Sequence, residues 1–456
     1  AGLAFGLLLL SEVFYYYSFD SFYPDAERIY VVCENFRADK SSEKLETHNR
    51  VSGAVAPGLK AEVPGIAAAC RLNNMGSSVF YTDDGKSYKA AFSLAEDNLF
   101  DVLPRPVIIG NPSEILKSSM SCMVSDRIAE MIGGEVVGKV IELKEYPGKK
   151  LTIGGIFKGL PENTNYEYDI LVSMTSTSVF MWDGTNNWLG NDRYNVCVKL
   201  EPGVDPEQLA PAVRKMQEVH QDIEKLEMMQ QGMVLKYSFK PLKKIHVENV
   251  GNNITILTAI AFAVLLVSLL NYILLTLSAL INRAKNSAIY KTYGAGVKNL
   301  QMMIFTDTAL IFLLSISGAL IIITSLQPLI EAHIGHNLSA TVNPYVIWPL
   351  LSLLVLILLA VSYFPGRFYA SVPVSSVFHS FPVKGNSWKL ALLLFEFAGT
   401  VFILIVLVVI TLQYERLRSS DHGYRSKGIF YVSTSGMPGK RLSTVLNELR
   451  SFPQIE

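Results

Sequence analysis

The stretch Ile254–Ile281 reads ITILTAIAFAVLLVSLLNYILLTLSALI and contains no Asp, Glu, Lys or Arg. A helix needs about 20 mostly apolar residues to cross the hydrocarbon core of a bilayer, so this stretch predicts a membrane-spanning helix. Later runs of similar character predict further spans at Met302–Leu326, Val346–Phe364 and Leu390–Leu412. A shorter apolar run, Gly2–Tyr17, is expected to be the outer half of a first membrane helix whose cytoplasmic start is missing.

The overall composition also favours a membrane protein. Of the 456 residues, 50% are hydrophobic and 18% are charged, and the mean hydropathy is +0.29. Soluble domains carry about 25% charged residues, so the composition excludes a disordered chain and disfavours a purely soluble enzyme. The 40 basic and 40 acidic residues balance. No nucleic-acid partner is expected, because the chain has no overall charge that would attract one.

Basic residues in the loops between the spans predict the orientation, because Lys and Arg in short loops mark the cytoplasmic side. The loops Arg283–Asn299 and Pro365–Lys389 carry several basic residues and no acid, whereas Gln327–Pro344 carries no Lys or Arg. The first two loops are therefore expected inside and the third outside. The large segment before Ile254 and the tail after Tyr414 are then also outside.

The cysteines all fall in the segment that is expected outside the membrane. They are Cys33, Cys70, Cys122 and Cys197. Their spacing fits no CxxC metal site, and neither a metal nor another cofactor is expected. Disulfides form in such compartments, so a disulfide and free buried thiols both stay open.

The outer segment, residues 18–250, reads as an α+β domain. Runs rich in β-branched and aromatic residues predict strands at Arg28–Glu34, Ala67–Leu72, Ser78–Thr82, Lys89–Ser93, Lys139–Leu143, Leu151–Phe157, Asn195–Leu200 and Val234–Pro241. Helices are expected at Val55–Glu62, Ser125–Ile132 and Pro206–Met229. Two β-α-β passages would flank a mainly β insert of about residues 97–191, which predicts two outer lobes.

The tail from Trp388 resembles a second copy of the start of the chain. Each copy has an apolar run and then a predicted strand, at Arg28–Val32 and at Gly428–Ser433. Each then has a helix candidate that ends in an apolar-Pro-x-Ile stretch, at Val63–Ile66 and at Phe452–Ile455. Internal repeats are common in transporters. The chain is therefore expected to stop inside a second outer domain, with three membrane helices of the second half missing.

Four motifs lie beside the apolar runs. They are RAKNSAIYKTYGA at Arg283–Ala295, FPG at Phe364–Gly366 followed by Pro373, FKGLPENT at Phe157–Thr164, and FDSFYP at Phe19–Pro24 followed by Arg28–Tyr30. Together they resemble FtsX-like permeases of the MacB type, the membrane subunits of ABC transporters, and most closely the long duplicated permeases of Bacteroidetes. In the first motif, Asn286 and Ala288 stand where the family usually has Glu and Gly.

The resemblance implies a cytosolic ABC ATPase as partner. This ATPase would bind a coupling helix within residues 283–299. The residues expected to contact the ATPase are Arg283, Lys285, Ile289, Lys291, Tyr293 and Gly294, with a second cytoplasmic contact at Pro365, Arg367 and Pro373. Ile289 and Tyr293 share one face of a helix, where apolar anchors would fill a pocket and basic residues would meet an acidic rim. The alternative is that the basic residues anchor lipid headgroups.

Several polar residues in or near the spans are candidate functional sites. Asp307 and Glu396 lie near the cytoplasmic surface, where water solvates them at little cost, and no polar chain suited to a proton relay crosses the membrane. Asn271 is expected to make an interhelical hydrogen bond rather than to bind an ion. His333 and His336 have the spacing of metal ligands, but no third ligand is near in sequence.

No catalytic motif is present. The sequence contains no GxxxxGK[ST], GxSxG or HExxH pattern, so the chain is not expected to be an enzyme. Trp182 and Trp188 lie in a Gly/Asn-rich loop, where contact with a partner or substrate, core packing and a lipid-facing role stay open.

The expected fold class is an α-helical transmembrane bundle with a large α+β extracytoplasmic domain of the MacB periplasmic core type. The expected layout is a first membrane helix at 1–17, an outer domain at 18–250, an FtsX-like domain with three helices at 254–364, a cytoplasmic linker at 365–389, a fifth helix at 390–412 that starts the second repeat, and the start of a second outer domain at 413–456.

The expected function is that of a permease subunit in the bacterial inner (plasma) membrane. It would couple ATP hydrolysis by the partner to export or extraction of a hydrophobic, peptide or lipoprotein cargo. The alternative is an ATPase-coupled signalling or scaffold protein that regulates cell-envelope enzymes. Membrane lipid is a further expected partner, and a periplasmic adaptor and a second permease are left open.

Overall fold

The computed structural model describes residues 2–37, 45–229, 233–282, 289–371, 387–420, 429 and 439–453. The chain divides into two compact units. The helical unit comprises Ala1–Ser18 and Val250–Ile429, and the sheet unit comprises Phe19–Asn249 and Phe430–Glu456.

The sheet unit contains an 11-stranded sheet within the described residues. Its strands are β1 (Ile29–Arg37), β2 (Glu46–His48), β3 (Ile66–Thr82), β4 (Ser87–Ala95), β5 (Val107–Ile109), β6 (Ser121–Ser125), β7 (Val140–Leu143), β8 (Lys150–Phe157), β9 (Ile170–Ser173), β10 (Asn195–Leu200) and β11 (Val234–Pro241). Its helices are η1 (Ala26–Arg28), α2 (Val55–Glu62), α3 (Leu99–Val102), α4 (Pro112–Lys117), α5 (Asp126–Ile132), η2 (Met174–Ser176), α6 (Thr177–Phe180), η3 (Pro206–Leu209), α7 (Ala210–Gln221), α8 (Ile223–Met229) and α16 (Gly439–Ser451).

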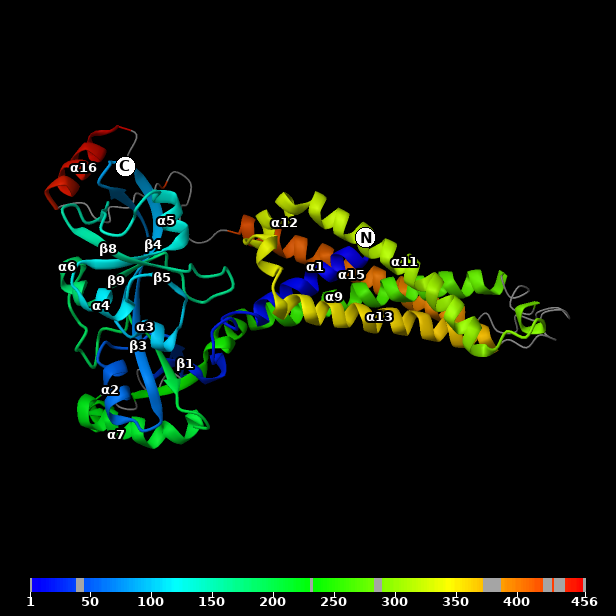
Figure 1. The fold of residues 1–456 in the computed structure, drawn as a ribbon, viewed down its shortest axis with the longest axis horizontal. Coiled ribbons are helices and arrows are strands. Elements are labelled where there is room, and N and C mark those ends of the chain that lie inside the picture. The colour runs from blue at the N-terminus through cyan, green and yellow to red at the C-terminus, as the bar shows by residue number, and fades with distance from the viewer. Residues whose placement is uncertain are drawn as a thin grey trace. The chain divides into compact units, whose positions relative to one another are not determined.

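The main path of the sheet runs β11-β1-β10-β3-β4-β9-β6-β8-β5 (Figure 1). The first four of these strands come from the two ends of the domain and form a split β-α-β arrangement. β1 and β3 are joined through α2 with β10 between them, and β10 and β11 are joined through α7 with β1 between them. The predicted β-α-β passages therefore exist, and α2 and α7 pack against each other.

One strand connects the two ends of the domain to the insert. β3 is 17 residues long, and it pairs with β10 through its first half and with β4 through its second half. The sequence predicted two separate strands here, which is wrong because a bulge between Asn74 and Gly76 lets the strand continue through its turn-forming residues. One continuous sheet contains strands from the flanking parts of the domain and from the insert. The division of the domain into two lobes therefore stays a prediction.

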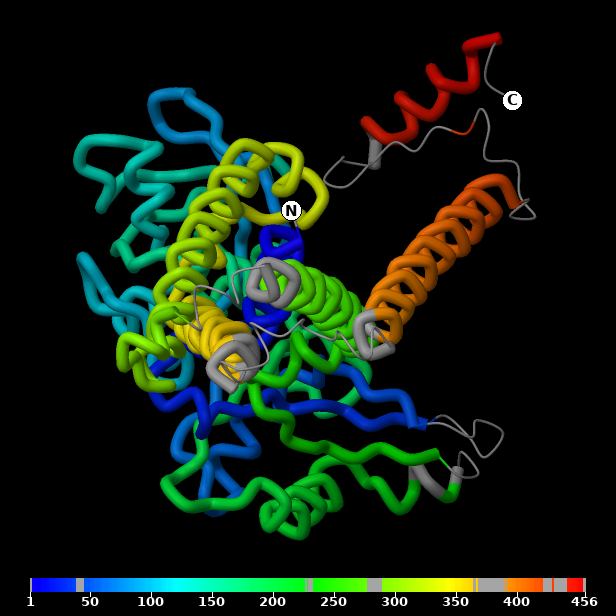
Figure 2. Tube along the Cα trace, turned by 90° about the vertical axis from the view of Figure 1, so that its right-hand side faces the viewer, coloured from blue at the N-terminus to red at the C-terminus, as the bar shows by residue number. Residues whose placement is uncertain are grey.

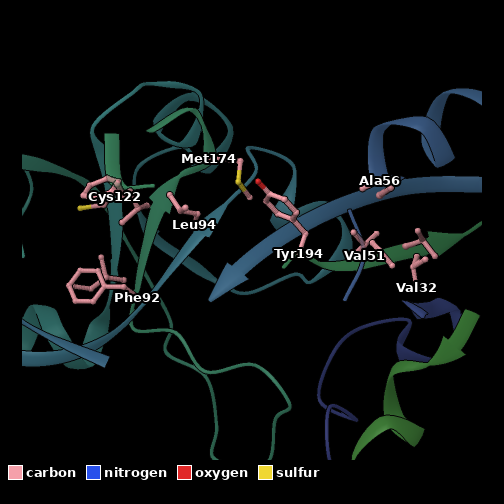
Figure 3. Close-up of a cluster of buried hydrophobic side chains, with 14 of the residues drawn as sticks. Val32, Val51, Ala56, Phe92, Leu94, Cys122, Met174 and Tyr194 are labelled. Atoms are coloured by element: carbon pink, nitrogen blue, oxygen red, sulfur yellow. The ribbon is translucent and has the colours of Figure 1, made fainter. Parts of the chain in front are cut away.

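The hydrophobic core likewise extends through both parts. Figure 3 shows Val32 of β1, Val51, Phe92 of β4 and Tyr194 from the flanking parts together with Cys122 of β6 from the insert, in one cluster of buried side chains. Each of these residues is 0% exposed. The insert therefore folds as part of the same hydrophobic core.

Most other predicted elements of the sheet unit are confirmed, but one predicted helix is broken and four short strands were not predicted. α2 has the predicted bounds, and α5 begins at Asp126 because Ser125 caps it by accepting a hydrogen bond from the Ile128 N–H. The long helix predicted at Pro206–Met229 is wrong, because Asp222 adopts a left-handed conformation (φ 46°) and separates α7 from α8. The strands β2, β5, β6 and β9 were missed, since segments of three to five residues show too little periodicity.

The helical unit contains α1 (Gly2–Tyr17), most of α9 (Leu242–Asn282), α11 (Val297–Ser325), α12 (Gln327–Ile334), η4 (Leu338–Thr341), α13 (Pro344–Ser371) and α15 (Ser387–Ser419). Within the described residues, four helices are long and apolar enough to cross a membrane: Leu242–Thr276, Val297–Ser325, Pro344–Tyr363 and Leu393–Ser419. α1 is a shorter apolar helix that packs against α11 and α13. Figure 2 shows α15 leaning away from the other helices of this unit.

Two helices are longer than their predicted spans. α9 begins at Leu242, before the predicted start, and its first turns bury Leu242 and Ile245 in the core of the sheet unit. α13 continues through Pro365 to Ser371, although the cytoplasmic linker was expected to start at that proline. Proline removes one intrahelical hydrogen bond, and here Arg367 supports the turn by donating to the Tyr363 hydroxyl over 2.8 Å.

The predicted repeat is described only in part. α16 lies where the second copy was expected to have a helix, and it precedes Phe452 and Pro453 as α2 precedes Val63 and Pro64. The strand predicted at Gly428–Ser433 lies outside the described residues, apart from residue 429.

Candidate functional site

The predicted coupling segment presents two exposed apolar side chains. Residues 289–292 are helical, and Ile289 and Tyr293 are 45% and 89% exposed. Gly294 ends the turn with a φ of +91°, and the Ala295 N–H donates to the Tyr290 carbonyl over 2.9 Å. This is the left-handed glycine that commonly terminates a helix, and it leaves Tyr293 at the tip of the loop.

The basic residues of this segment are described only in part. Lys291 is half-buried, and Arg283 and Lys285 lie outside the described residues. For the second predicted contact, Pro365 lies within α13, Arg367 is exposed, and Pro373 lies outside the described residues.

Segments next to the two predicted contact regions approach each other in the helical unit. α11 begins just after the coupling segment and packs along α13. At the end of α13, a Cβ built on Gly366 would lie 3.9 Å from the Cα of Gln301, so the two backbones approach closely there. A groove of about 290 Å³ lies between α11 and α13 near this point. It is lined mainly by Met302, Phe305 and Tyr363.

The sheet unit joins two of the family-like motifs at one buried carboxylate. Asp20, in the FDSFYP motif, is 0% exposed. Its Oδ1 accepts a hydrogen bond from the Thr164 hydroxyl over 2.6 Å, and its Oδ2 accepts one from the Asn165 N–H over 3.2 Å. The Asp20 N–H donates to the Asn163 carbonyl over 3.0 Å. Burial raises the pKa of Asp20 to about 6, and the donated hydrogen bonds oppose this rise.

The same part of the sheet unit holds the start of α9. The Phe19 ring stacks on the His246 ring with centroids 3.4 Å apart, and Lys243 makes an ion pair with Glu27 at 2.5 Å. The segment that enters the sheet unit and the helix that leaves it are therefore fastened to each other. Phe19 and Asp20 belong to a motif visible in the sequence, but their contacts join residues too far apart in the chain to be predicted from it.

The helical unit contains a contact between a buried carboxylate and a histidine that the sequence did not reveal. Glu12 on α1 is 6% exposed, and its carboxylate lies 3.0 Å from Nε2 of His336, which follows α12. Tyr15 stacks on the His336 ring with centroids 4.1 Å apart. The only available signal was an acid inside an apolar run. His333 bonds to the Leu329 carbonyl instead, so the two histidines weighed as metal ligands have separate partners.

The other polar candidates have different environments. Asp307 is exposed and Glu396 is half-buried. Asn271 is exposed and makes no hydrogen bond to any residue that the structure describes, and the interhelical hydrogen bond stays a prediction. Trp188 stacks on His220 at 4.1 Å and is a packing residue, whereas Trp182 is 63% exposed.

The four cysteines are free and buried, which decides between the two alternatives in favour of thiols. Cys70 and Cys197 face each other across β3 and β10. The Tyr166 hydroxyl lies 2.9 Å from the Cys197 sulfur. Burial raises the pKa of Cys33 to about 11, so this thiol is neutral at ordinary pH.

Comparison with known proteins identifies two domains. Residues 4–216 match the family described as the MacB-like periplasmic core domain, and residues 258–374 match the FtsX-like permease C-terminal family. No curated protein matched the chain.

Solved structures of related domains also match. A domain of a candidate permease protein from Porphyromonas gingivalis is 34% identical, with a TM-score of 0.44, and the match covers 48% of this chain and 91% of that chain. The periplasmic region of MacB from Actinobacillus actinomycetemcomitans is 11% identical, with a TM-score of 0.32 and coverage of 50% and 94%. The extracellular domain of the noncanonic ABC-type transporter YknZ from Gram-positive bacteria is 14% identical, with a TM-score of 0.32 and coverage of 46% and 99%.

The matches confirm the expected fold class, a transmembrane helical protein with a large extracytoplasmic α/β domain. Permeases of this type are the transmembrane components of ABC transporters and have no catalytic site of their own, and they work with a cytosolic ABC ATPase. With a MacB-like periplasmic core domain followed by an FtsX-like permease domain, the chain belongs to the FtsX/MacB-like ABC transporter permeases.

Proposed function

We propose that this permease couples ATP hydrolysis by a cytosolic ABC ATPase to movement of its extracytoplasmic domain in the bacterial inner membrane. The movement would serve export or extraction of a hydrophobic, peptide or lipoprotein cargo. Membrane lipid would surround the exposed apolar helices, and a periplasmic adaptor and a second permease are further proposed partners.

The observation that carries this proposal is the continuity of α9. Its first turns bury Leu242 and Ile245 in the core of the sheet unit, and the same helix continues to Asn282. The proposed ATPase-contact segment follows directly in the sequence. A displacement of that segment would therefore act on a helix whose other end is part of the extracytoplasmic core.

The chemistry of the coupling segment supports an ATPase contact. Ile289 and Tyr293 are four residues apart, so they lie on one side of the turn, and both are exposed. Exposed apolar and aromatic side chains of this kind act as anchors in protein interfaces. Lys291 and Lys298 add positive charge beside them, suited to an acidic rim on the partner.

The test is co-purification of the permease with its ATPase from membranes. The double substitution Ile289→Asp and Tyr293→Asp places charge on both anchors, and we expect it to reduce ATPase recovery at least about tenfold. The matched control is Ile108→Asp with Tyr81→Asp, because these side chains are 53% and 41% exposed on the extracytoplasmic domain. Unchanged recovery with the first pair, or equal loss with both pairs, contradicts the proposed contact.

A further inference from the structure

A cavity of about 830 Å³ opens in the sheet unit. β1 pairs with β10 only from Ile29 to Val31. Beyond that point β1 pairs with β2, and Val51 forms a single bridge to Tyr194, so residues 46–51 lie between the separated strands. Small-molecule sites in proteins usually enclose about 300–1,000 Å³, so the space suits a small ligand.

One wall of the cavity holds a buried carboxylate with no partner. Glu34 is 8% exposed and lines the cavity. Its side chain makes no hydrogen bond or ion pair with any residue among those described. Burial and then the negative charge of Asp192 raise the pKa of Glu34 to about 7. A buried carboxylate normally needs a cation or several donors, so this wall is suited to a positively charged group.

Positive charge is present in the cavity but does not pair with Glu34. Arg50 lines the same space and is exposed, and its guanidinium has no partner within the described part of the chain. Arg50 and Glu34 thus offer opposite charges to a ligand instead of neutralising each other. Guanidinium groups bind carboxylates with paired hydrogen bonds.

Amide groups complete the lining. Asn49 accepts a hydrogen bond from the Cys33 thiol on its Oδ1 over 3.3 Å, which leaves its amide N–H groups available. The side chain of Asn195 makes no hydrogen bond to a described residue. Asp192 accepts a hydrogen bond from the Ser52 hydroxyl, which fixes its carboxylate at the cavity wall. Such groups can orient a polar ligand with both donors and acceptors.

We propose that this cavity binds a small zwitterion of the amino-acid or short-peptide class, with its ammonium group on Glu34 and Asp192 and its carboxylate on Arg50. The proposal goes beyond the proposed function, because binding in this cavity does not depend on an ATPase contact.

The test uses the full chain in lipid nanodiscs and isothermal titration calorimetry with three probes. Trialanine carries both charges, N-acetyl-trialanine lacks the ammonium, and trialanine amide lacks the carboxylate. We expect saturable binding of trialanine and a loss of about 10–100-fold in affinity for each of the other two, as expected for removal of one charged hydrogen bond.

Variants assign the two charges to residues. Glu34→Gln should weaken trialanine about 10–100-fold and reduce the preference over N-acetyl-trialanine, with Asp192 left to hold the ammonium. Arg50→Gln should remove the preference over trialanine amide. The control is Glu201→Gln, which makes the same chemical change at an exposed residue outside the cavity lining, and we expect it to leave all three affinities unchanged.

Four outcomes overturn the proposal. They are absence of trialanine binding, equal binding of all three probes by the unsubstituted chain, a preference over N-acetyl-trialanine that Glu34→Gln does not reduce, and binding of trialanine amide as tight as that of trialanine. The probe series on the unsubstituted chain is informative even where a variant fails to fold. The double substitution Ile289→Asp and Tyr293→Asp is expected to weaken ATPase association and to leave the affinities for the three probes unchanged. The two proposals can therefore fail independently of each other.

Discussion

In the sheet unit, large apolar side chains such as Phe92 and Leu94 are fully buried, whereas in the helical unit Phe402 and Leu407 are 67% and 59% exposed. None of the residues in the most apolar window of α15 is buried. Both units are built from the same kinds of apolar residue, so the difference lies in the surrounding medium. Water drives apolar side chains inward, and a hydrocarbon medium removes that drive.

The largest expected effect separates the two units by one chemical change. Phe92→Ala should lower the stability of the sheet unit by about 3–5 kcal/mol, because the truncation leaves a cavity in a close-packed core. Phe402→Ala should change stability much less, since lipid can fill the vacated space. Thermal unfolding in nanodiscs, followed by near-UV circular dichroism, measures both. Equal losses would break the comparison.

A second effect compares a buried and an exposed ion pair. Arg71 donates from Nε to Glu96 over 3.0 Å, and its Nη1 donates to the Gly53 and Thr185 carbonyls over 2.6 Å each. The side chains of Arg71 and Glu96 are 9% and 18% exposed, so Glu96→Gln should cost about 2–3 kcal/mol by leaving a buried cation without its counter-charge.

The control for this change lies on α7. Glu218 pairs with Arg214 at 2.9 Å, and its side chain is 45% exposed. Glu218→Gln should cost at most about 0.5 kcal/mol, because water solvates both charges. Urea unfolding of the two variants gives the difference, and similar midpoints would mean that Arg71 finds other acceptors.

The smallest expected effect is a pH dependence confined to the sheet unit. The folded-state pKa of Glu34 is raised from 4.5 to about 7, so the folded state holds this proton more tightly than the unfolded chain. Stability should therefore rise as pH falls from about 7.5 to 5, by about 1–2 kcal/mol. The titratable groups that interact with Glu34 are Asp192 and Tyr237, and His48 and Arg50 line the same cavity.

Glu34→Gln isolates this contribution. The variant should lose most of the gain between pH 7.5 and 5, while Asp20, whose pKa is raised to about 6, still contributes below pH 6. Thermal midpoints measured across this range test the assignment. An identical slope in the variant and the unsubstituted chain would show that Glu34 is solvated in the folded state.

Periodicity and composition predicted the parts of the fold in which a local pattern decides the structure. The membrane helices follow from apolar runs, and α2 has the predicted bounds because Pro64 stops it. The long helix before β11 was wrong because an aspartate, not a glycine, takes the left-handed conformation at residue 222. Local propensity gave no sign that such a residue would break the helix.

The candidate sites also differ in whether a local sequence pattern could predict them. The coupling segment was predicted from its motif, and the structure adds the exposure of Tyr293 and the turn at Gly294. The pair formed by Glu12 and His336 joins residues 324 positions apart, and the cavity at Glu34 depends on where two strands separate. Contacts of this range depend on the assembled fold, and a single sequence contains no local signal for them.

The complete burial of Cys33, Cys70, Cys122 and Cys197, each 0% exposed, has a practical consequence for mapping the two faces of the protein. A maleimide that cannot cross a bilayer will find no native thiol at the surface of the folded sheet unit. A single cysteine introduced at Lys158 or at Lys291 will therefore be the only reactive group, and its labelling in intact cells will report directly on which side of the membrane that position lies.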